Sequence, residues 1–585
     1  MSSLGRKGLF AREGGGSSQT QRERDMMPKS SVFSVTAIGS TQVKLAMVFS
    51  GALIAASALT FSEVSAQGRT GKGVVAPELP SSPGFHTPAP RLSAAEHEAL
   101  LRRLHRKQEQ FASEANASVK EKSADQQTAP LGAETGAVEN DSETHGTLLI
   151  GRNIKNTRAE AAGNSTLAEP AAINNRGQVL YAGNFRHLEY STNHGVSYND
   201  RNMPAGPADA PTVCCDNDMV IDDGTKFGFH STLYVNNALN NGVVRIFVKP
   251  PRNLGRTKCS YTIDPAGANN NILPDYPHIA LTKNFLYLTI NALQTSGVSF
   301  RRIYRFNMRS MRRCERTAFT TFTQSSSFIG QRIWVPAEGA NNQRIMYWVQ
   351  HDDSDTIRIF RWREVDVSPA QFTRNVQASN FSNPDCRGGT GNFDFIERST
   401  AWSIAGFRTR STVAQGNHQR TGLLAVYWHS APIGGITQAH IRGAVFSLAG
   451  LGLLNQPHIF NQNFCFGYPA VTGNIFGDIG ITLAWGGKAG GNGFAARAGV
   501  GIDDDFTPGL GFFQTVVRTA FGVANRSDGR FGDYFTIHPY QPCDRWFGAT
   551  NYAWDSAPVD NPNDVNARWV EFGREANLSC YEHAQ

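Results

Sequence analysis

The sequence predicts an all-β protein built as a six- or seven-bladed β-propeller, and three observations lead to this prediction. From about residue 146 onward, short β-rich runs are separated by Gly, Asn, Asp and Ser turns. A run of aromatic and β-branched residues recurs roughly every 60 residues, beginning at 179, 233, 286, 346, 425, 481 and 545. Further apolar runs precede or follow most copies, so one repeat can supply the four antiparallel strands of a blade.

The strands expected on either side of each recurring run complete the blade. Pro277–Ala280 and Phe535–Ile537 precede two of the runs, and Arg302–Phe306 follows one. A single blade cannot bury both of its faces, so several blades must pack around one axis. Seven runs predict seven blades, or six if the last run only completes the first blade. The rival architecture, a pair of β-sandwiches, would not explain a repeat sustained over the whole span.

Composition limits the class of protein. With 40% hydrophobic and 18% charged residues in a chain of 585, the protein is neither a polytopic membrane protein nor disordered throughout. The formal net charge is +7 and no long Lys/Arg run occurs. These features argue against a dedicated nucleic-acid binder.

Residues 1–66 have the three parts of an export signal. Lys44 precedes an apolar run from Leu45 to Phe61, and the small-residue exit Val64-Ser65-Ala66 follows. We therefore expect a signal peptide with an extended n-region and a mature chain outside the cytoplasm, either secreted or periplasmic. An uncleaved membrane anchor is the alternative, since the run approaches spanning length. No second such run occurs, so no transmembrane anchor is expected after cleavage.

Residues 67–145 are rich in Pro, Ser, Ala, Glu and Gln and predict a low-complexity linker. Inside it, residues 92–119 show apolar spacings of three and four, which predict a helix. This helix could dock on the main domain, pair with another chain, or stay solvated because its apolar stripe is thin. The β-propeller domain is expected over residues 146–585.

The cysteines agree with export. An even number in an exported chain predicts disulfide bonds, without indicating the pairing. The adjacent Cys214 and Cys215 could form a vicinal bond, but separate partners are the favoured interpretation. The eight cysteines are Cys214, Cys215, Cys259, Cys314, Cys386, Cys465, Cys543 and Cys580.

One turn carries a resemblance to a known family. Ser191, Asn193, Gly195 and Tyr198 resemble the Asp-box (BNR repeat) of sialidase-like propellers, with Asn193 in place of the Asp. The segment from Arg530 to Tyr534 is similar to the closing region of secreted bacterial members. The resemblance implies a sialidase-like propeller in which the Asp-box is a structural turn. Asn can bond turn amides as Asp does, and Gly permits a positive φ.

The same comparison shows departures from the family. A sialidase carries an Arg-Ile-Pro motif in its first blade, and this tripeptide is absent from the sequence. The family's three arginines, its Tyr/Glu pair and its Asp acid have no matching positions. The fold is therefore expected without the sialidase chemistry.

Candidate site residues precede the predicted innermost strands, where loops open on one face of a propeller. Arg530, Asp533 and Tyr534 are the candidate catalytic residues. Asp275, Tyr276 and Tyr468 occupy similar positions in other blades and are candidates for ligand binding. Such a ring could bind a polar ligand or a cation. The alternative is a set of turn caps and salt bridges between blades.

Two clusters of acidic residues on loops could bind calcium, because calcium needs several oxygen ligands. Asp503, Asp504 and Asp505 are the candidate metal ligands, and Asp216, Asp218, Asp222 and Asp223 form a second cluster. Neither matches the twelve-residue calcium loop, and solvated acidic turns are the alternative. No cofactor other than calcium is indicated.

Two histidines and one glycine-rich run could also belong to a site. His351 and His429 end equivalent strands of successive blades, which favours hydrogen-bonded strand ends over a metal pair. Residues 486–499 lack the order of a phosphate loop and predict a long flexible hairpin.

The predicted function follows from these features. Of the 40 basic residues after residue 145, only six are lysine. Arginine forks suit carboxylates, sulfates and phosphates, although a GC-rich genome gives the same excess. We expect a non-catalytic binding or scaffold domain for an extracellular glycan or a protein partner. A carbohydrate-active enzyme, either a glycoside hydrolase or a polysaccharide lyase, is the alternative. The sequence does not decide whether the protein is an enzyme, and it does not indicate an oligomeric state.

Overall fold

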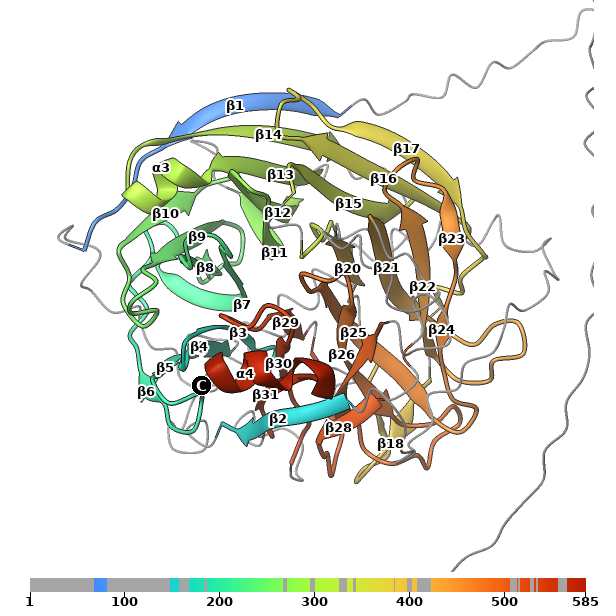
Figure 1. The fold of residues 1–585 in the computed structure, drawn as a ribbon. Coiled ribbons are helices and arrows are strands. Elements are labelled where there is room, and N and C mark those ends of the chain that lie inside the picture. Colours follow the sequence, from blue (N-terminus) through green and yellow to red (C-terminus); the bar gives the residue numbers. More distant parts are fainter. Residues whose placement is uncertain are drawn as a thin grey trace, which may run out of the picture. The chain divides into compact units, whose positions relative to one another are not determined.

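The computed structural model contains seven antiparallel four-stranded blades arranged as a β-propeller (Figure 1). All seven recurring runs of the sequence form the second strand of a blade, which confirms the predicted repeat and selects seven blades over six. The structure describes residues 68–80, 148–156, 168–183, 187–266, 271–294, 300–325, 334–339, 343–382, 385–396, 402–407, 422–504, 513, 516–526, 531–532, 535–555 and 565–584.

The first three blades each contain four consecutive strands. From the axis outward these are β3 (Ala171–Asn175), β4 (Gln178–Gly183), β5 (His187–Ser191) and β6 (Asn199–Asp200) in blade 1; β7 (Thr212–Ile221), β8 (Gly228–Val235), β9 (Gly242–Lys249) and β10 (Cys259–Ile263) in blade 2; and β11 (Ile272–Leu281), β12 (Phe285–Gln294), β13 (Phe300–Asn307) and β14 (Thr317–Ser325) in blade 3.

The next three blades continue the same order. They contain β15 (Ile345–His351), β16 (Thr356–Arg363) and β17 (Ala370–Asn375) in blade 4; β20 (Trp402–Phe407), β21 (Leu423–Ser430), β22 (His440–Ser447), β23 (Leu453–Asn455) and β24 (His458–Ile459) in blade 5; and β25 (Cys465–Gly473), β26 (Ile479–Gly486), β27 (Arg497–Asp503) and β28 (Val516–Ala520) in blade 6. The innermost position of blade 4 is taken by the segment around Pro336, which forms an antiparallel bridge with Trp348.

Blade 7 joins the two ends of the propeller. Its first three strands are β29 (Thr536–Pro539), β30 (Phe547–Asn551) and β31 (Arg568–Arg574), and its outermost strand is β2 (Leu148–Lys155) from before blade 1. Because an early strand completes the last blade, closure of the ring depends on backbone hydrogen bonds between β2 and β31. The short helices η2 (Glu575–Asn577) and α4 (Leu578–Ala584) follow β31.

Strand β1 (Arg69–Val75) lies inside the segment expected to be a linker. It pairs with β14 and forms a fifth strand on the outer edge of blade 3. An exposed outer edge offers unpaired backbone groups, and β1 satisfies them although its composition is Gly-rich. The helix expected over residues 92–119 and the export signal lie outside the described residues.

The core consists of separate apolar clusters between adjacent blades. Strands such as β7, β8 and β9 are buried along their whole length, because neighbouring blades cover both faces of each sheet. Aromatic rings dominate between blades 3, 4 and 5, where Trp348 stacks on Phe360 with ring centroids 4.9 Å apart. In the part of the chain that is described, no helix is long and apolar enough to cross a membrane.

All eight cysteines form disulfides: Cys214–Cys215, Cys259–Cys314, Cys386–Cys465 and Cys543–Cys580. The prediction that the cysteines are paired is therefore confirmed. The favoured interpretation that Cys214 and Cys215 have separate partners is wrong. The other six cysteines pair among themselves between distant segments, which leaves each of these two neighbours with only the other.

Candidate functional site

A recurring irregularity shapes the innermost strands at the axis. Asp216, Tyr276 and Tyr468 all have a left-handed backbone, with φ values of 51°, 55° and 55°. Each lies where the pairing of the first and second strands shifts register. Such a bulge re-aims the side chains that follow it. Asp218 and His278, two residues beyond the bulge in blades 2 and 3, form a close polar contact between these blades.

The first axial pair is that of Asp218 and His278. Asp218 Oδ2 lies 3.4 Å from His278 Nδ1, and the Asp218 side chain is only 1% exposed. The carboxylate also accepts the backbone N–H of Met219 and of Ile279, both at 2.8 Å. Ile279 belongs to blade 3, so one buried carboxylate connects two neighbouring blades through both a side chain and the backbone.

The second axial pair joins Glu338 of blade 4 to His538 of blade 7, with Glu338 Oε2 3.1 Å from His538 Nδ1. Burial raises the pKa of Glu338. Burial also opposes protonation of His538, but the carboxylates of Glu338, Asp218 and Asp223 outweigh it and raise the pKa of His538.

A small cavity surrounds the second pair at the axis. Among the described residues, His538 Nε2 and Thr472 Oγ1 are buried without a hydrogen-bond partner, and both residues line this cavity. The channel is narrow at this level, because a Cβ on Gly339 would lie 2.8 Å from the backbone N of Gly473, in the non-adjacent blade 6. The lining residues are Val220, Ile221, Ala280, Leu281, Glu338, Gly339, Thr472, His538 and Pro539.

The site residues predicted from sequence are not the ones that form the two axial pairs. Arg530, Asp533 and Tyr534 lie outside the described residues. Asp275 is buried in β11 opposite Asn291 of β12. The rings of Tyr276 and Tyr468 are buried in the cores between blades, so the described structure gives both a packing role.

The backbone of both tyrosines joins neighbouring blades. The N–H of Tyr276 donates to Asp216 Oδ2 at 3.1 Å, and the N–H of Tyr468 donates to His429 Nε2 at 2.8 Å. Burial lowers the pKa of His429 to about 3, so this imidazole is neutral and accepts through Nε2. The hydrogen bond of His429 confirms the strand-end interpretation for this residue. Burial likewise lowers the pKa of His351 to about 3, and its ring packs against Trp428.

The turn between β5 and β6 has a dense set of hydrogen bonds. Ser191 Oγ accepts the N–H of Gly195 at 2.9 Å, and Asn193 Oδ1 accepts the N–H of Ser197 at 3.0 Å. Gly195 has φ +81°, and the ring of Tyr198 is buried against Tyr181. Asn193 therefore bonds the turn amide that the sequence assigned to it, and the turn has a structural role.

The acidic residues proposed for calcium are engaged elsewhere. Asp504 forms a two-point ion pair with Arg574, at 2.5 Å and 2.9 Å, which links blade 6 to blade 7. Asp503 is fully buried at the end of β27, and Asp505 lies outside the described residues. In the second cluster, Asp222 caps a turn and pairs with Arg312. No group of three or more metal-binding side chains occurs among the described residues.

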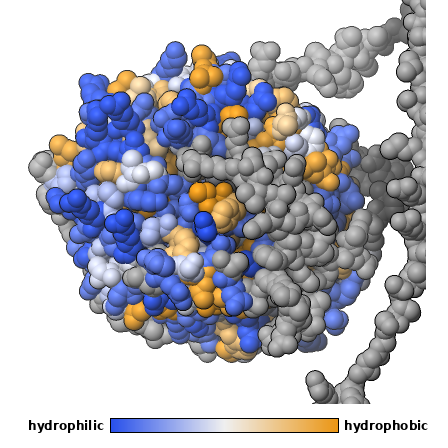
Figure 2. Space-filling model, in the orientation of Figure 1, coloured by the Kyte–Doolittle hydropathy of each residue, from blue (hydrophilic) through white to orange (hydrophobic). Residues whose placement is uncertain are grey.

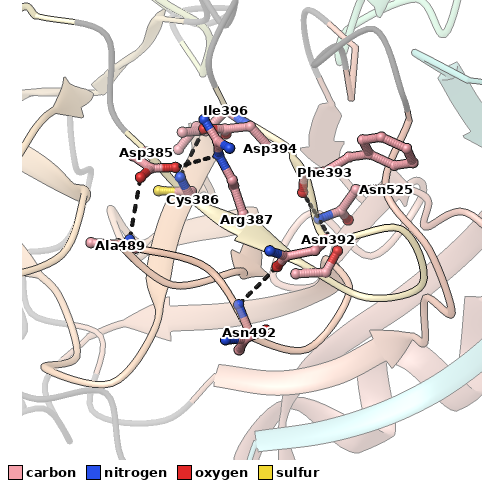
Figure 3. Close-up of polar contacts among 12 residues, drawn as sticks. Asp385, Cys386, Arg387, Asn392, Phe393, Asp394, Ile396, Ala489, Asn492 and Asn525 are labelled. Atoms are coloured by element: carbon pink, nitrogen blue, oxygen red, sulfur yellow. Dashed lines mark hydrogen bonds and ion pairs between the residues drawn. The ribbon is translucent and has the colours of Figure 1, made fainter.

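The glycine-rich run connects the antiparallel strands β26 and β27 as the predicted hairpin, and a second hairpin contacts it. Strands β18 (Arg387–Gly388) and β19 (Phe393–Asp394) form this hairpin, and Figure 3 shows its polar contacts with the 486–496 segment. Asn392 Oδ1 accepts the N–H of Asn492 at 2.8 Å. A Cβ on Gly487 would lie 2.1 Å from the carbonyl oxygen of Cys386. Glycine therefore permits backbone-to-backbone packing here.

Sequence reasoning missed Glu338 and His538. The candidates predicted from sequence precede the innermost strands, whereas these two residues lie within and at the end of such segments. The available signal was a charged or imidazole side chain inside an otherwise apolar innermost strand, as in the Thr536–Pro539 strand. Their meeting across blades 4 and 7 could not be read from sequence separation.

No protein family and no curated protein matches this sequence. Solved structures with a similar fold include the BP39L lectin from Burkholderia pseudomallei (10% identity, TM-score 0.38), with 69% of this chain and 96% of that chain covered. A Penicillium chrysogenum α-L-arabinanase is similar at 7% identity and TM-score 0.35, with 73% and 98% covered. The NanB sialidase from Streptococcus pneumoniae is similar at 8% identity and TM-score 0.33, with 57% and 67% covered. At these values the similarities assign no function to this chain.

Proposed function

We propose that this protein is an exported, sialidase-like propeller that binds an extracellular glycan without cleaving it. The observation that carries the proposal is the pairing of the axial ionisable groups between blades. Most glycosidases use two carboxyl groups that flank an open substrate site, and sialidases, with a Tyr nucleophile, are an exception. Here Asp218 is closed to solvent and Glu338 is paired with His538. These groups hold the described part of the channel together and leave no open pair of carboxylates there.

Export is supported by the paired cysteines, since disulfides persist in oxidising compartments. The turn at Ser191–Tyr198 supports the sialidase-like interpretation through its hydrogen bonds and its buried tyrosine. If the export signal is cleaved as proposed, the mature chain begins at or near Gln67. N-terminal sequencing that found Met47 retained would contradict export by cleavage.

One observation favours an enzyme as the second candidate. A carboxylate that orients a histidine through Nδ1, with Nε2 directed to a cavity, is the arrangement of an acid–base pair. Glu338 and His538 have it, and Thr472 contributes a hydroxyl to the same cavity. The narrow channel at Gly339 argues against access by a sugar ring.

The mature protein should be incubated with neutral, sialylated, uronate-bearing and sulfated glycans, and binding and product formation measured in parallel. We expect binding to at least one glycan without new reducing ends or unsaturated uronates. Product formation by the wild type that is abolished in Glu338→Gln and His538→Gln would overturn the binding proposal in favour of the enzyme. A protein that neither binds nor converts any glycan would refute both and leave a protein partner.

A further inference from the structure

Two surface segments of blades 2 and 3 concentrate positive charge on one face of the propeller. The 250–258 turn joins β9 to β10, and the 308–316 segment, which includes α3 (Met308–Arg313), joins β13 to β14. Both connect a third strand to a fourth strand, so they lie on the same side of the ring, at the left in the upper half of Figure 1. We call their cationic side chains the basic surface: Arg252, Arg256, Lys258, Arg309, Arg312, Arg313 and Arg316.

The two segments are fixed to each other. The Cys259–Cys314 disulfide joins the end of the turn to the end of α3. Lys258 Nζ donates to the carbonyl oxygen of Arg312 at 2.6 Å. The turn is anchored beneath by the N–H of Leu254, which donates to Gln178 Oε1 of blade 1 at 2.9 Å. The basic surface is therefore preorganised, which reduces the ordering cost of binding.

Little negative charge offsets the basic surface. The two segments contain one acidic residue, Glu315, whose carboxylate lies 3.8 Å from Arg313. Asp222, buried just after β7, pairs with Arg312, which is itself partly buried. The other six cationic residues are exposed. Figure 2 shows a mainly hydrophilic surface in the region over α3.

We propose that the basic surface binds an anionic polysaccharide that carries sulfates or uronates. This inference rests on the proposed glycan-binding function and specifies its ligand class and its surface. Guanidinium forks bind sulfate and carboxylate groups by paired hydrogen bonds, and six of the seven cationic residues are arginines. A polymer with repeated anions can engage several of them at once.

The chemistry of the surface favours a polysaccharide over other polyanions. The exposed large apolar side chains of the described chain all lie outside the two segments, whereas docking on a membrane surface normally inserts such side chains. Neither segment contains an aromatic residue, so neither offers the stacking platforms of single-stranded nucleic-acid sites.

The test compares two triple charge reversals of the mature protein. The first is Arg256→Glu/Arg313→Glu/Arg316→Glu. The control changes three exposed basic residues elsewhere by the same charge, Lys72→Glu/Arg344→Glu/Lys488→Glu. Affinity is measured for heparin, polygalacturonate, neutral dextran, a DNA duplex and vesicles with anionic lipid, near 0.15 M salt. Thermal unfolding checks that all the variants are folded.

We expect heparin or polygalacturonate to bind, the first triple variant to lose at least tenfold in affinity, and the control less than threefold. Equal losses in both variants would show an effect of net charge alone and overturn the proposal. Full binding by the first variant would place the glycan site elsewhere, with the proposed function intact. If the wild type binds the DNA duplex or the anionic vesicles more tightly than heparin and polygalacturonate, an anionic polysaccharide is refuted as the ligand class. Failure of the wild type to bind any glycan would refute the proposed function itself.

Discussion

His429 provides a quantitative test of how the blades are joined. Its Nε2 accepts the buried N–H of Tyr468 at 2.8 Å, and burial lowers its pKa to about 3. In the unfolded chain the same imidazole titrates at its ordinary value of about 6.5. Because the pKa of His429 is lower in the folded state, the protein has its full stability at pH values above the unfolded pKa. This stabilisation is lost as the pH falls from about 6.5 toward about 3.

The magnitude follows from this difference. At pH 5 the unfolded state gains about 2 kcal/mol by protonating this one histidine, whereas at pH 7.5 it gains almost nothing. The His429→Gln variant keeps an acceptor for the N–H of Tyr468 but no longer titrates. It should lose about 2 kcal/mol less stability than the wild type between pH 7.5 and pH 5. His429→Leu leaves that N–H unsatisfied and should cost about 1 to 3 kcal/mol already at pH 7.5.

The assay is urea denaturation of the mature protein, followed by tryptophan fluorescence, at both pH values. His351 and the other buried histidines are present in every variant, so their contributions cancel in the comparison. An unchanged pH dependence in His429→Gln would refute a neutral, buried His429. A His429→Leu variant as stable as the wild type would refute the hydrogen bond as a joint between blades 5 and 6.

Three further predictions concern covalent bonds, charge and backbone packing. Thiol titration of the denatured, unreduced mature protein should detect fewer than about one free thiol, since every cysteine is paired. Asp504→Asn removes the ion-pair partner of Arg574, whose side chain is only 11% exposed. The free energy of unfolding, measured by urea denaturation, should fall by about 3 kcal/mol or more. Asp385→Asn, which breaks an exposed pair, should change stability by less than about 1 kcal/mol. Gly339→Ala places a Cβ 2.8 Å from backbone at φ +74° and should lower the melting temperature, whereas Gly450→Ala, with nothing within 4 Å, should not.

Much of the architecture could be predicted from short-range patterns. The second strands of the blades, such as those containing Leu286–Asn291 and Met346–His351, can be predicted because each is a local run of β-branched and aromatic residues. The turn at Ser191–Tyr198 is equally local, because the bonds of Ser191 Oγ to Gly195 and of Asn193 Oδ1 to Ser197 each span four positions. That the cysteines form disulfides, although not which cysteine bonds to which, follows from their even number and the predicted compartment.

Partners distant in the sequence could not be predicted. Glu338 and His538 are two hundred positions apart in sequence, and they meet only because blades 4 and 7 face the same axis. Tyr468 was a candidate for ligand binding because it precedes a strand, yet its ring is buried, since the bulge turns it into the core between blades. The basic surface required the same step, because only the fold and the Cys259–Cys314 bond bring the two segments together.

The sequence by itself determined the fold class, the number of strand repeats and the expectation of an oxidising compartment, because each depends on composition or on spacings within one blade. The tertiary structure alone decided that the ring has seven blades closed by β2, and which ionisable groups pair at the axis. It also decided which charges gather on one face. These outcomes depend on the closing of the ring, which brings residues from distant blades into contact. The entropic cost of closing such long loops depends on the whole intervening chain, so it cannot be inferred from a local sequence pattern.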